Sequence, residues 1–219
     1  MAPPAGGTAI IINAGPNDAV NLSGLTIDGT GIGAWGIVFN SGASLVIENC
    51  VARNLTSSGI ALQPAAPARI AVSNTIVANN GVHGIYLQPT GIGTVSAVFN
   101  RVEAYSNGQE GIGIYGNSLS SGGVVEATAV DSVAGFNNDG FYALGSSSEF
   151  NTDVFVFRST TIRNVRSAIR AEQNAIVHVS SSHLEAGGVW GQSTGGCVAS
   201  FGDNIIDQAA PCGTVIGKN

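Results

Sequence analysis

The chain has 219 residues, of which 44% are hydrophobic and 10% are charged, and its formal net charge is −6. The apolar share argues against disorder, and the length is sufficient for one domain with a continuous core. A single lysine and few arginines disfavour a nucleic-acid partner or an anionic membrane surface, because both are recognised by clustered positive charge. No apolar run approaches about 18 residues, so we expect no membrane insertion.

Residues 1–7 have neither a charged n-region nor an apolar h-region, so they do not form a signal peptide. Strand-like sequence begins immediately afterwards, at Thr8. We therefore expect the sequence to be the exported part of a longer precursor that carried a signal and an N-terminal cap. The expected location is secreted, periplasmic or at the cell surface, and the alternative is a complete cytoplasmic protein.

A glycine or alanine followed by a short apolar strand recurs along the chain. The copies are Gly36-Ile37-Val38-Phe39, Gly59-Ile60-Ala61-Leu62, Gly84-Ile85-Tyr86-Leu87, Gly111-Ile112-Gly113-Ile114, Gly140-Phe141-Tyr142-Ala143, Ala168-Ile169-Arg170-Ala171 and Gly188-Val189-Trp190-Gly191. A six-residue block runs in step with this strand at spacings of 21 to 31 residues, and its first residues are Gly24, Asn49, Asn74, Asn100, Asp131, Thr160, Ser182 and Asp203. A self-similar period of this length indicates a solenoid.

The strands determine which solenoid is expected. Apolar residues alternate with period two, as in Leu45-Val46-Ile47, which excludes helical repeats, and leucine is too sparse for leucine-rich repeats. The run from Asn49-Cys50-Val51 to Gly59-Ile60-Ala61-Leu62, repeated 25 residues later, resembles the parallel β-helix repeats of the pectate-lyase-like superfamily, and in particular exported bacterial β-helix proteins of unassigned activity.

That resemblance covers roughly residues 19–208 and implies an all-β, right-handed, single-stranded parallel β-helix of about eight coils. We expect one domain over residues 1–219, with a truncated first coil at 1–18, repeat coils at 19–208 and a C-terminal cap or tail at 209–219. Longer coils carry extra residues at 116–123 and 145–148, which we expect to form loops on one face, often the binding face.

Two rows of side chains are expected to face the core. The glycine-led strands contribute Ile37, Ile60, Ile85, Ile112, Phe141, Ile169 and Val189. The third residues of the six-residue blocks contribute Thr26, Val51, Ile76, Val102, Val133, Ile162, Leu184 and Ile205. The first residues of the blocks tolerate left-handed backbone, so they predict a turn ladder.

An outward row beside the glycine-led strands holds the candidate site. His83, Glu110 and Asp139 precede the glycines of successive coils, which would place them about 5 Å apart. Aromatic rings stack on sugars, so the candidate ligand-binding residues are His83, Tyr86, Tyr142 and Trp190. In a catalytic interpretation, Glu110 and Asp139 are acid and nucleophile, and Arg170 is a base or clamp. The simpler interpretation is a set of solvated turn residues.

The register of one coil stays open. If Gly113-Ile114-Tyr115 replaces Gly111-Ile112-Gly113 in the alignment, Tyr115 joins Tyr86 and Tyr142 in a ladder and Glu110 leaves the acid row. Tyr115 is therefore a further candidate ligand-binding residue.

Other polar residues give weaker signals. Arg158, Arg163, Arg166 and Arg170 either grip an acidic polymer or, as we favour, pair with acids such as Glu172 and Glu185. A disulfide between Cys197 and Cys212 is possible at the C-terminal end; Cys50 would then be a buried small hydrophobe or pair outside this sequence. No acid cluster of the pectate-lyase calcium type occurs, so we expect no metal and no cofactor, with Ca²⁺ bound by carboxylates as the alternative.

These observations lead to three functional expectations. The first is a carbohydrate-associated module that binds a polysaccharide without strong catalysis. The second is a polysaccharide lyase, glycoside hydrolase or epimerase acting on an acidic polysaccharide. The third is a structural module that self-associates through its open coil ends or lateral faces.

Overall fold

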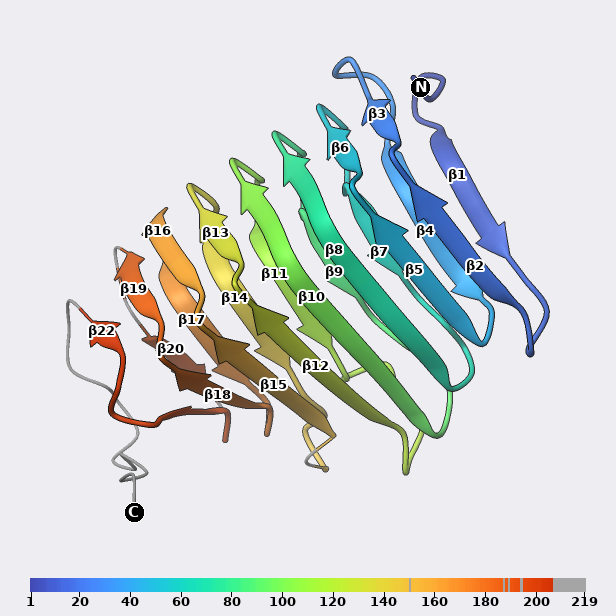
Figure 1. Ribbon diagram of the computed structural model, residues 1–219. Helices are drawn as coiled ribbons and strands as arrows, with labels where there is room; N and C mark the ends of the chain where they lie inside the picture. Colours follow the sequence, from blue (N-terminus) through green and yellow to red (C-terminus); the bar gives the residue numbers. More distant parts are fainter. Residues whose placement is uncertain (150, 187, 189, 194, 207–219) are drawn as a thin grey trace.

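The computed structural model describes residues 1–149, 151–186, 188, 190–193 and 195–206, and of residues 190–193 it describes the backbone alone. Over this part of the chain the protein is all-β, contains no helix, and forms a parallel β-solenoid of about seven turns, close to the eight coils predicted. Figure 1 shows the coils stacked from the N-terminus (blue) towards the C-terminus (red). Among these residues no helix is long and apolar enough to cross a membrane.

Sheet A consists of the predicted glycine-led strands, together with an N-terminal strand, and all of them are parallel. In spatial order its strands are β1 (Thr8–Asn13), β4 (Trp35–Ser41), β7 (Ile60–Leu62), β9 (Ile85–Leu87), β11 (Glu110–Tyr115), β14 (Asp139–Leu144), β17 (Ser167–Glu172) and β20 (Trp190–Ser193). Since each coil contributes one strand, residues at equivalent positions form straight rows along the stack.

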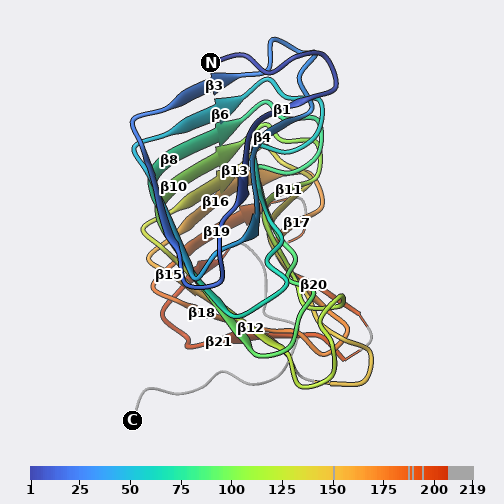
Figure 2. The same ribbon diagram turned by 90° about the vertical axis from the view of Figure 1, so that its right-hand side faces the viewer.

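Sheet B is bent into two columns. The first contains β2 (Ala19–Ser23), β5 (Ser44–Glu48), β12 (Val124–Val130), β15 (Thr152–Phe157), β18 (Ile176–Ser180) and β21 (Cys197–Ser200). The second contains β3 (Thr26–Asp28), β6 (Val51–Arg53), β13 (Val133–Gly135), β16 (Thr160–Asn164), β19 (His183–Ala186) and β22 (Ile205–Ile206). Two long strands, β8 (Ala68–Ala78) and β10 (Thr94–Tyr105), run through both columns and join them. Seen along the stack, these columns and sheet A form walls around the interior (Figure 2).

The hydrophobic core lies inside the coils. The inward row of sheet A is at most 2% exposed, which confirms the prediction for Ile37, Ile60, Ile85, Ile112, Phe141 and Ile169. Burying a side chain of this size stabilises the fold by about 1.5–3 kcal/mol. The remaining residue of the predicted row, Val189, lies outside the described residues.

The second predicted inward row is wrong. Of its eight residues only Val102 and Leu184 are buried, while Val133 and Ile205 are 37% and 68% exposed. The inward row of the second column lies elsewhere and includes Ile27, Ala52, Val77, Ala104 and Ala134.

The turn chemistry explains the error. A left-handed residue at the corner, such as Asn49 or Asn74, redirects the chain so that the next residue already points inward. Cys50 and Thr75, which follow them, are at most 2% exposed. Alternation therefore starts one residue earlier than the sequence pattern predicts.

The predicted turn ladder exists, with changed members. Its left-handed residues have φ between 46° and 76° and are Gly24, Asn49, Asn74, Arg101, Asp131, Arg158, Ser181 and Gly202. The prediction is thus confirmed in four coils, and in the other four it is one or two residues off, since Asn100, Thr160, Ser182 and Asp203 were expected.

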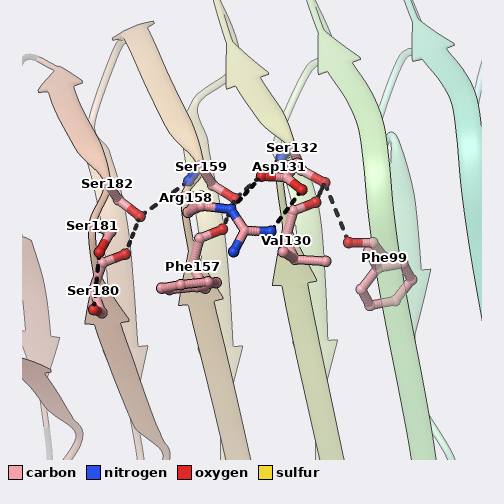
Figure 3. A network of polar contacts seen from close by, with 10 residues as sticks. All are labelled: Phe99, Val130, Asp131, Ser132, Phe157, Arg158, Ser159, Ser180, Ser181 and Ser182. Carbon is pink, nitrogen blue, oxygen red and sulfur yellow. Dashed lines mark hydrogen bonds and ion pairs between the residues drawn. The ribbon is translucent and has the colours of Figure 1, made fainter.

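On the core side of this corner, serine hydroxyls accept hydrogen bonds from the backbone (Figure 3). Ser132, Ser159 and Ser182 occupy successive coils and are at most 3% exposed. The backbone N–H of Ser132 donates to Ser159 Oγ at 3.2 Å, and that of Ser159 donates to Ser182 Oγ at 3.1 Å. On the outside, Arg158 donates two hydrogen bonds to Asp131, at 2.8 and 2.9 Å. The polar backbone of the turn is therefore satisfied on the core side by hydroxyls.

A second corner, between sheet B and sheet A, contains a buried asparagine ladder. Asn80, Asn107, Asn137 and Asn164 are at most 3% exposed. Each of the first three donates its side-chain amide to the side-chain oxygen of the next, at 3.0, 3.0 and 3.3 Å. This ladder joins four coils through groups that would be costly to bury without partners.

The two predicted loops lie side by side, which agrees with the expectation that they share a face. Ser121 of the first loop donates at 2.9 Å to Glu149, the residue after the second, and both loops follow directly from sheet A strands, β11 and β14. Cys50 is a buried core residue, as in the simpler of its two interpretations. Cys212 lies outside the described residues, so its disulfide with Cys197 stays a prediction.

Candidate functional site

The outer face of sheet A carries the candidate site on four adjacent strands, β9, β11, β14 and β17. Their register pairs Ile85 with Ile112, and Ile112 with Phe141. Glu110 consequently pairs with Asp139, and Asp139 with Ser167. The first of the two alignments is therefore confirmed, and Glu110 stands in the acid row.

Tyr115 nevertheless reaches the aromatic row. Gly113 is the residue in register between Tyr86 and Tyr142, and a Cβ built on it would lie 2.7 Å from Cε2 of the Tyr115 ring. The ring of Tyr115 thus covers Gly113. Its centroid lies 4.9 Å from that of Tyr86 and 5.2 Å from that of Tyr142. The acid row and the tyrosine ladder, treated as alternatives in the sequence, coexist.

His83 and Glu110 form a close pair at one end of the site. Nδ1 of His83 lies 2.5 Å from Oε2 of Glu110, and the two residues are 8% and 6% exposed. The imidazole stacks on Tyr86, with ring centroids 4.9 Å apart and planes 12° from parallel. Burial raises the pKa of the Glu110 carboxyl, but the hydrogen bond and charge of His83, with the Tyr115 hydroxyl, outweigh it and hold that pKa below its usual range.

Asp139 is the most enclosed carboxyl of the site. It is 0% exposed, and its Oδ1 has no hydrogen-bond partner among the residues that the structure describes. Its Oδ2 lies 3.5 Å from Nη1 of Arg170 and 3.9 Å from Nη1 of Arg166. Burial raises the pKa of this carboxyl, and the charges of both arginines with the Ser167 hydroxyl offset that only partly.

On its β17 side, the site contains a second charged cluster, formed by Arg170 and Glu172. Arg170 donates to Glu172 and lies over the Tyr142 ring, with its Cζ 5.3 Å from the ring centroid. The Tyr142 hydroxyl donates to Glu172 Oε2 at 2.7 Å. Burial, followed by the hydrogen bond to Glu172, raises the pKa of Tyr142 well above its ordinary value. The favoured pairing of Arg170 with an acid is confirmed.

Trp190 departs from its predicted position. The backbone register pairs Trp190 with Ile169, and it is Gly191 that pairs with Arg170. The prediction that Trp190 continues the outward row beside Arg170 is therefore wrong by one residue. The alignment slips because the carbonyl of Gly188 accepts from the N–H of Ala168, as that of His83 accepts from Gly59, so Gly188 stands one position before the repeat glycine.

The arrangement offers two kinds of chemistry. The rings of Tyr86, Tyr115 and Tyr142 pack on one another at about the spacing of the coils; Tyr142 is buried, so the partly exposed rings of Tyr86 and Tyr115 are the ones available for stacking. Glu110 and Asp139 sit on neighbouring strands with pKa values moved in opposite directions, a pattern that separates acid and base roles. Both carboxyls are covered by the rings and by Arg170, so neither faces solvent directly. No group of three potential metal-ligating side chains lies together within the described part of the chain.

Two participants were not among the candidate site residues, although their positions in the repeat were visible. Ser167 lies in the acid row but has no charge or ring to mark it. Gln88 accepts a hydrogen bond from the hydroxyl of Tyr86. The signal for both was their position, since Ser167 precedes a repeat strand and Gln88 follows one. Residues in such a row gain their role from the neighbouring coils rather than from a motif of their own.

Comparison with known proteins adds no relative: no family model, no curated protein and no solved structure matches this chain.

Proposed function

We propose that this protein is a carbohydrate-associated module that binds a polysaccharide along the outer face of sheet A, and that it does so without catalysis. The observation that carries the proposal is the continuous ladder of Tyr86, Tyr115 and Tyr142, with ring spacings of 4.9 and 5.2 Å. The proposal also includes a relationship to exported proteins of the pectate-lyase-like superfamily and a secreted or surface location.

The ladder supports a chain-like ligand because its groups repeat. One coil advances by about 4.8 Å, which is close to the length that one sugar residue adds to an extended chain. Successive sugars would therefore meet the partly exposed rings of Tyr86 and Tyr115 in turn. The polar groups at its edges, His83 and Arg170, can bond hydroxyls or a carboxylate of the ligand.

Binding is favoured over catalysis because of how the carboxyls are held. Glu110 is bonded to His83, and Asp139 is fully enclosed beside Arg170. A general acid or nucleophile must come within hydrogen-bond reach of the reacting atoms. Neither group meets that requirement on this face without movement of the residues above it.

Affinity electrophoresis in gels that contain neutral or acidic polysaccharides tests the proposal. Retardation is expected for the unaltered protein, and Tyr115→Ala is expected to weaken binding about two- to tenfold, since stacking on an aromatic ring is worth about 0.5–1.5 kcal/mol. The matched control is Tyr105→Ala, because Tyr105 is an exposed tyrosine of β10 in sheet B. Absence of retardation by every polysaccharide, or an equal effect of both variants, contradicts the proposal.

The opposed pKa values of Glu110 and Asp139 favour one second candidate, an enzyme acting on an acidic polysaccharide. In that case Asp139 is the protonated acid, Glu110 the ionised partner, and Arg170 the clamp for the substrate carboxylate. Release of reducing ends or of unsaturated uronate from polygalacturonate or alginate tests it. Activity that survives in both Glu110→Gln and Asp139→Asn rules this candidate out.

A further inference from the structure

An open groove crosses the corner between sheet B and sheet A, away from the tyrosine ladder. Its volume is about 820 Å³ and it spans five successive coils. Each of these coils contributes one outward residue with left-handed backbone, with φ between 52° and 58°: Thr30, Asn54, Asn79, Ser106 and Phe136. With coils about 4.8 Å apart, the four steps between the first and the last extend over ~19 Å. The groove therefore suits an elongated ligand.

The groove is lined entirely by uncharged residues. The nearest described charge at its N-terminal end, Asp28, is already bonded to the Asn54 amide at 3.0 Å and to Arg53 at 2.9 Å. By contrast, the side chains of Asn79 and Ser106 are exposed and make no hydrogen bond to any other described residue. The surface thus offers amide and hydroxyl groups, which can bond a polyol without a charge on either side.

Two glycines keep the middle of the groove open. A Cβ on Gly81 would lie 2.3 Å from the carbonyl oxygen of Thr56, and one on Gly108 would lie 2.1 Å from that of Gly81. The coils stack too closely there for any side chain. The buried asparagine ladder forms the floor of the groove, where Asn80 donates its amide to Asn107 at 3.0 Å.

Phe136 closes one end of the groove and has an unusual backbone. It is 53% exposed at φ 58°, a conformation that is unfavourable for a bulky residue. Three arginines also have left-handed backbone: Arg101 and Arg158 bond to Asn74 and Asp131, and Arg163 follows Phe136 in the same row one coil further on. The Phe136 ring stacks on no other described aromatic or cationic group. An exposed ring in a strained position beside a polar groove is a candidate stacking platform.

We propose that this groove binds a neutral, unbranched oligosaccharide, with the Phe136 ring stacked on one sugar and the Asn79 amide and Ser106 hydroxyl bonded to sugar hydroxyls. The site is separate from sheet A and does not depend on the function proposed for that face. Its chemistry differs as well, because its lining residues are uncharged; the nearest cation of the row, Arg163, lies one coil beyond Phe136.

Isothermal titration calorimetry with cellohexaose, xylohexaose and maltohexaose tests the proposal, with trigalacturonate as the charged comparison. We expect at least one neutral hexamer to bind, and Phe136→Asn to weaken that binding at least tenfold. Asparagine tolerates left-handed backbone, so the same variant is expected to melt about 2–4 °C higher, which separates lost binding from lost folding. Asn79→Gly keeps the backbone and removes the amide, and should weaken binding in the same direction.

The controls distinguish this groove from sheet A. Phe155→Ala removes an exposed ring of β15 and is expected to leave the affinity unchanged, as is Tyr115→Ala. Failure of all three neutral hexamers to bind overturns the inference. Binding that is lost in Tyr115→Ala but retained in Phe136→Asn also overturns it, while leaving the function proposed for sheet A intact.

Discussion

The aromatic ring of Tyr115 occupies the space that a side chain at Gly113 would fill, two residues earlier on the same strand. This relationship lets one strand supply a carboxyl to the acid row and a ring to the tyrosine ladder. Glu110 and Tyr115 are linked in turn by a hydrogen bond. The absence of a side chain at Gly113 thus leaves room for the Tyr115 ring between Tyr86 and Tyr142.

Gly113→Ala tests that relationship. The new methyl group would lie 2.7 Å from the Tyr115 ring, so the ring must move, at a cost of about 1–3 kcal/mol. Urea unfolding measures the loss. If the steric cause is correct, the cost disappears when Tyr115→Ala is already present, and a double-mutant cycle shows that coupling. Equal costs in both backgrounds contradict it.

Glu110→Gln should destabilise the fold near neutral pH, because His83 loses a charged partner in a buried position, by about 1–3 kcal/mol. The folded-state pKa of Glu110 is lowered, so its contribution is present above the unfolded pKa and is lost as pH falls through the folded value. The difference between the two proteins should therefore shrink as pH falls below about 4.5, the ordinary value for glutamate. Unfolding free energies measured from about pH 3 to about pH 7 check the sign of this pH dependence.

Asp139→Asn should show the opposite pH dependence. Because burial raises the folded-state pKa of Asp139, the stability linked to its protonated form is lost as pH rises through that value. The unaltered protein should gain stability relative to Asp139→Asn as pH falls from neutrality towards the ordinary aspartate value of 3.8. Parallel slopes for the two carboxyl variants would show that their environments are not opposed.

Asn107→Ala should be among the most costly single changes in the corner between the sheets. Asn107 accepts from Asn80 and donates to Asn137 and to the carbonyl of Val77. Each buried partner left unbonded costs about 1–3 kcal/mol. Thermal unfolding compares it with Asn117→Ala, an exposed loop asparagine whose removal should have little effect.

Ser159→Ala and Asp131→Asn separate the inside of a turn from its outside. Ser159 is 2% exposed and receives the backbone N–H of Ser132, so its loss should cost about 1–3 kcal/mol. Asp131→Asn removes the ion pair with Arg158 on the solvent side, where such pairs contribute little, and asparagine tolerates the left-handed backbone. Chemical denaturation should rank the two changes in that order.

The sequence predicted the architecture well because the repeat is a packing pattern. The row from Ile37 to Ile169 was visible as glycine-led strands, and its burial follows from stacking coils. The row from Thr26 to Ile205 was misjudged because a left-handed corner changes the alternation, and backbone conformation is only partly encoded in residue type. Arg101 and Arg158 show this, since arginine is not a residue that turn chemistry predicts there.

The sequence predicted which residues form the site better than it predicted how they are arranged. His83, Glu110, Asp139, Tyr86, Tyr142 and Arg170 share one face, as expected, and Tyr115 joins them through space that the sequence does not display. The groove at Phe136 gave no signal, because its residues are ordinary turn residues until the coils are stacked. Contacts between residues about 25 to 30 positions apart arise only in the folded chain.

The two long strands that run through both columns of sheet B, β8 and β10, influence the order in which the protein unfolds. β8 and β10 have 11 and 12 residues and pair with each other over both columns, whereas the terminal β22 has only two residues. In a stack where each coil holds only its neighbours, unfolding advances as a front from a weak end. Amide hydrogens of β8 and β10 should then exchange last, and the central coils would act as the seed on which the others reassemble.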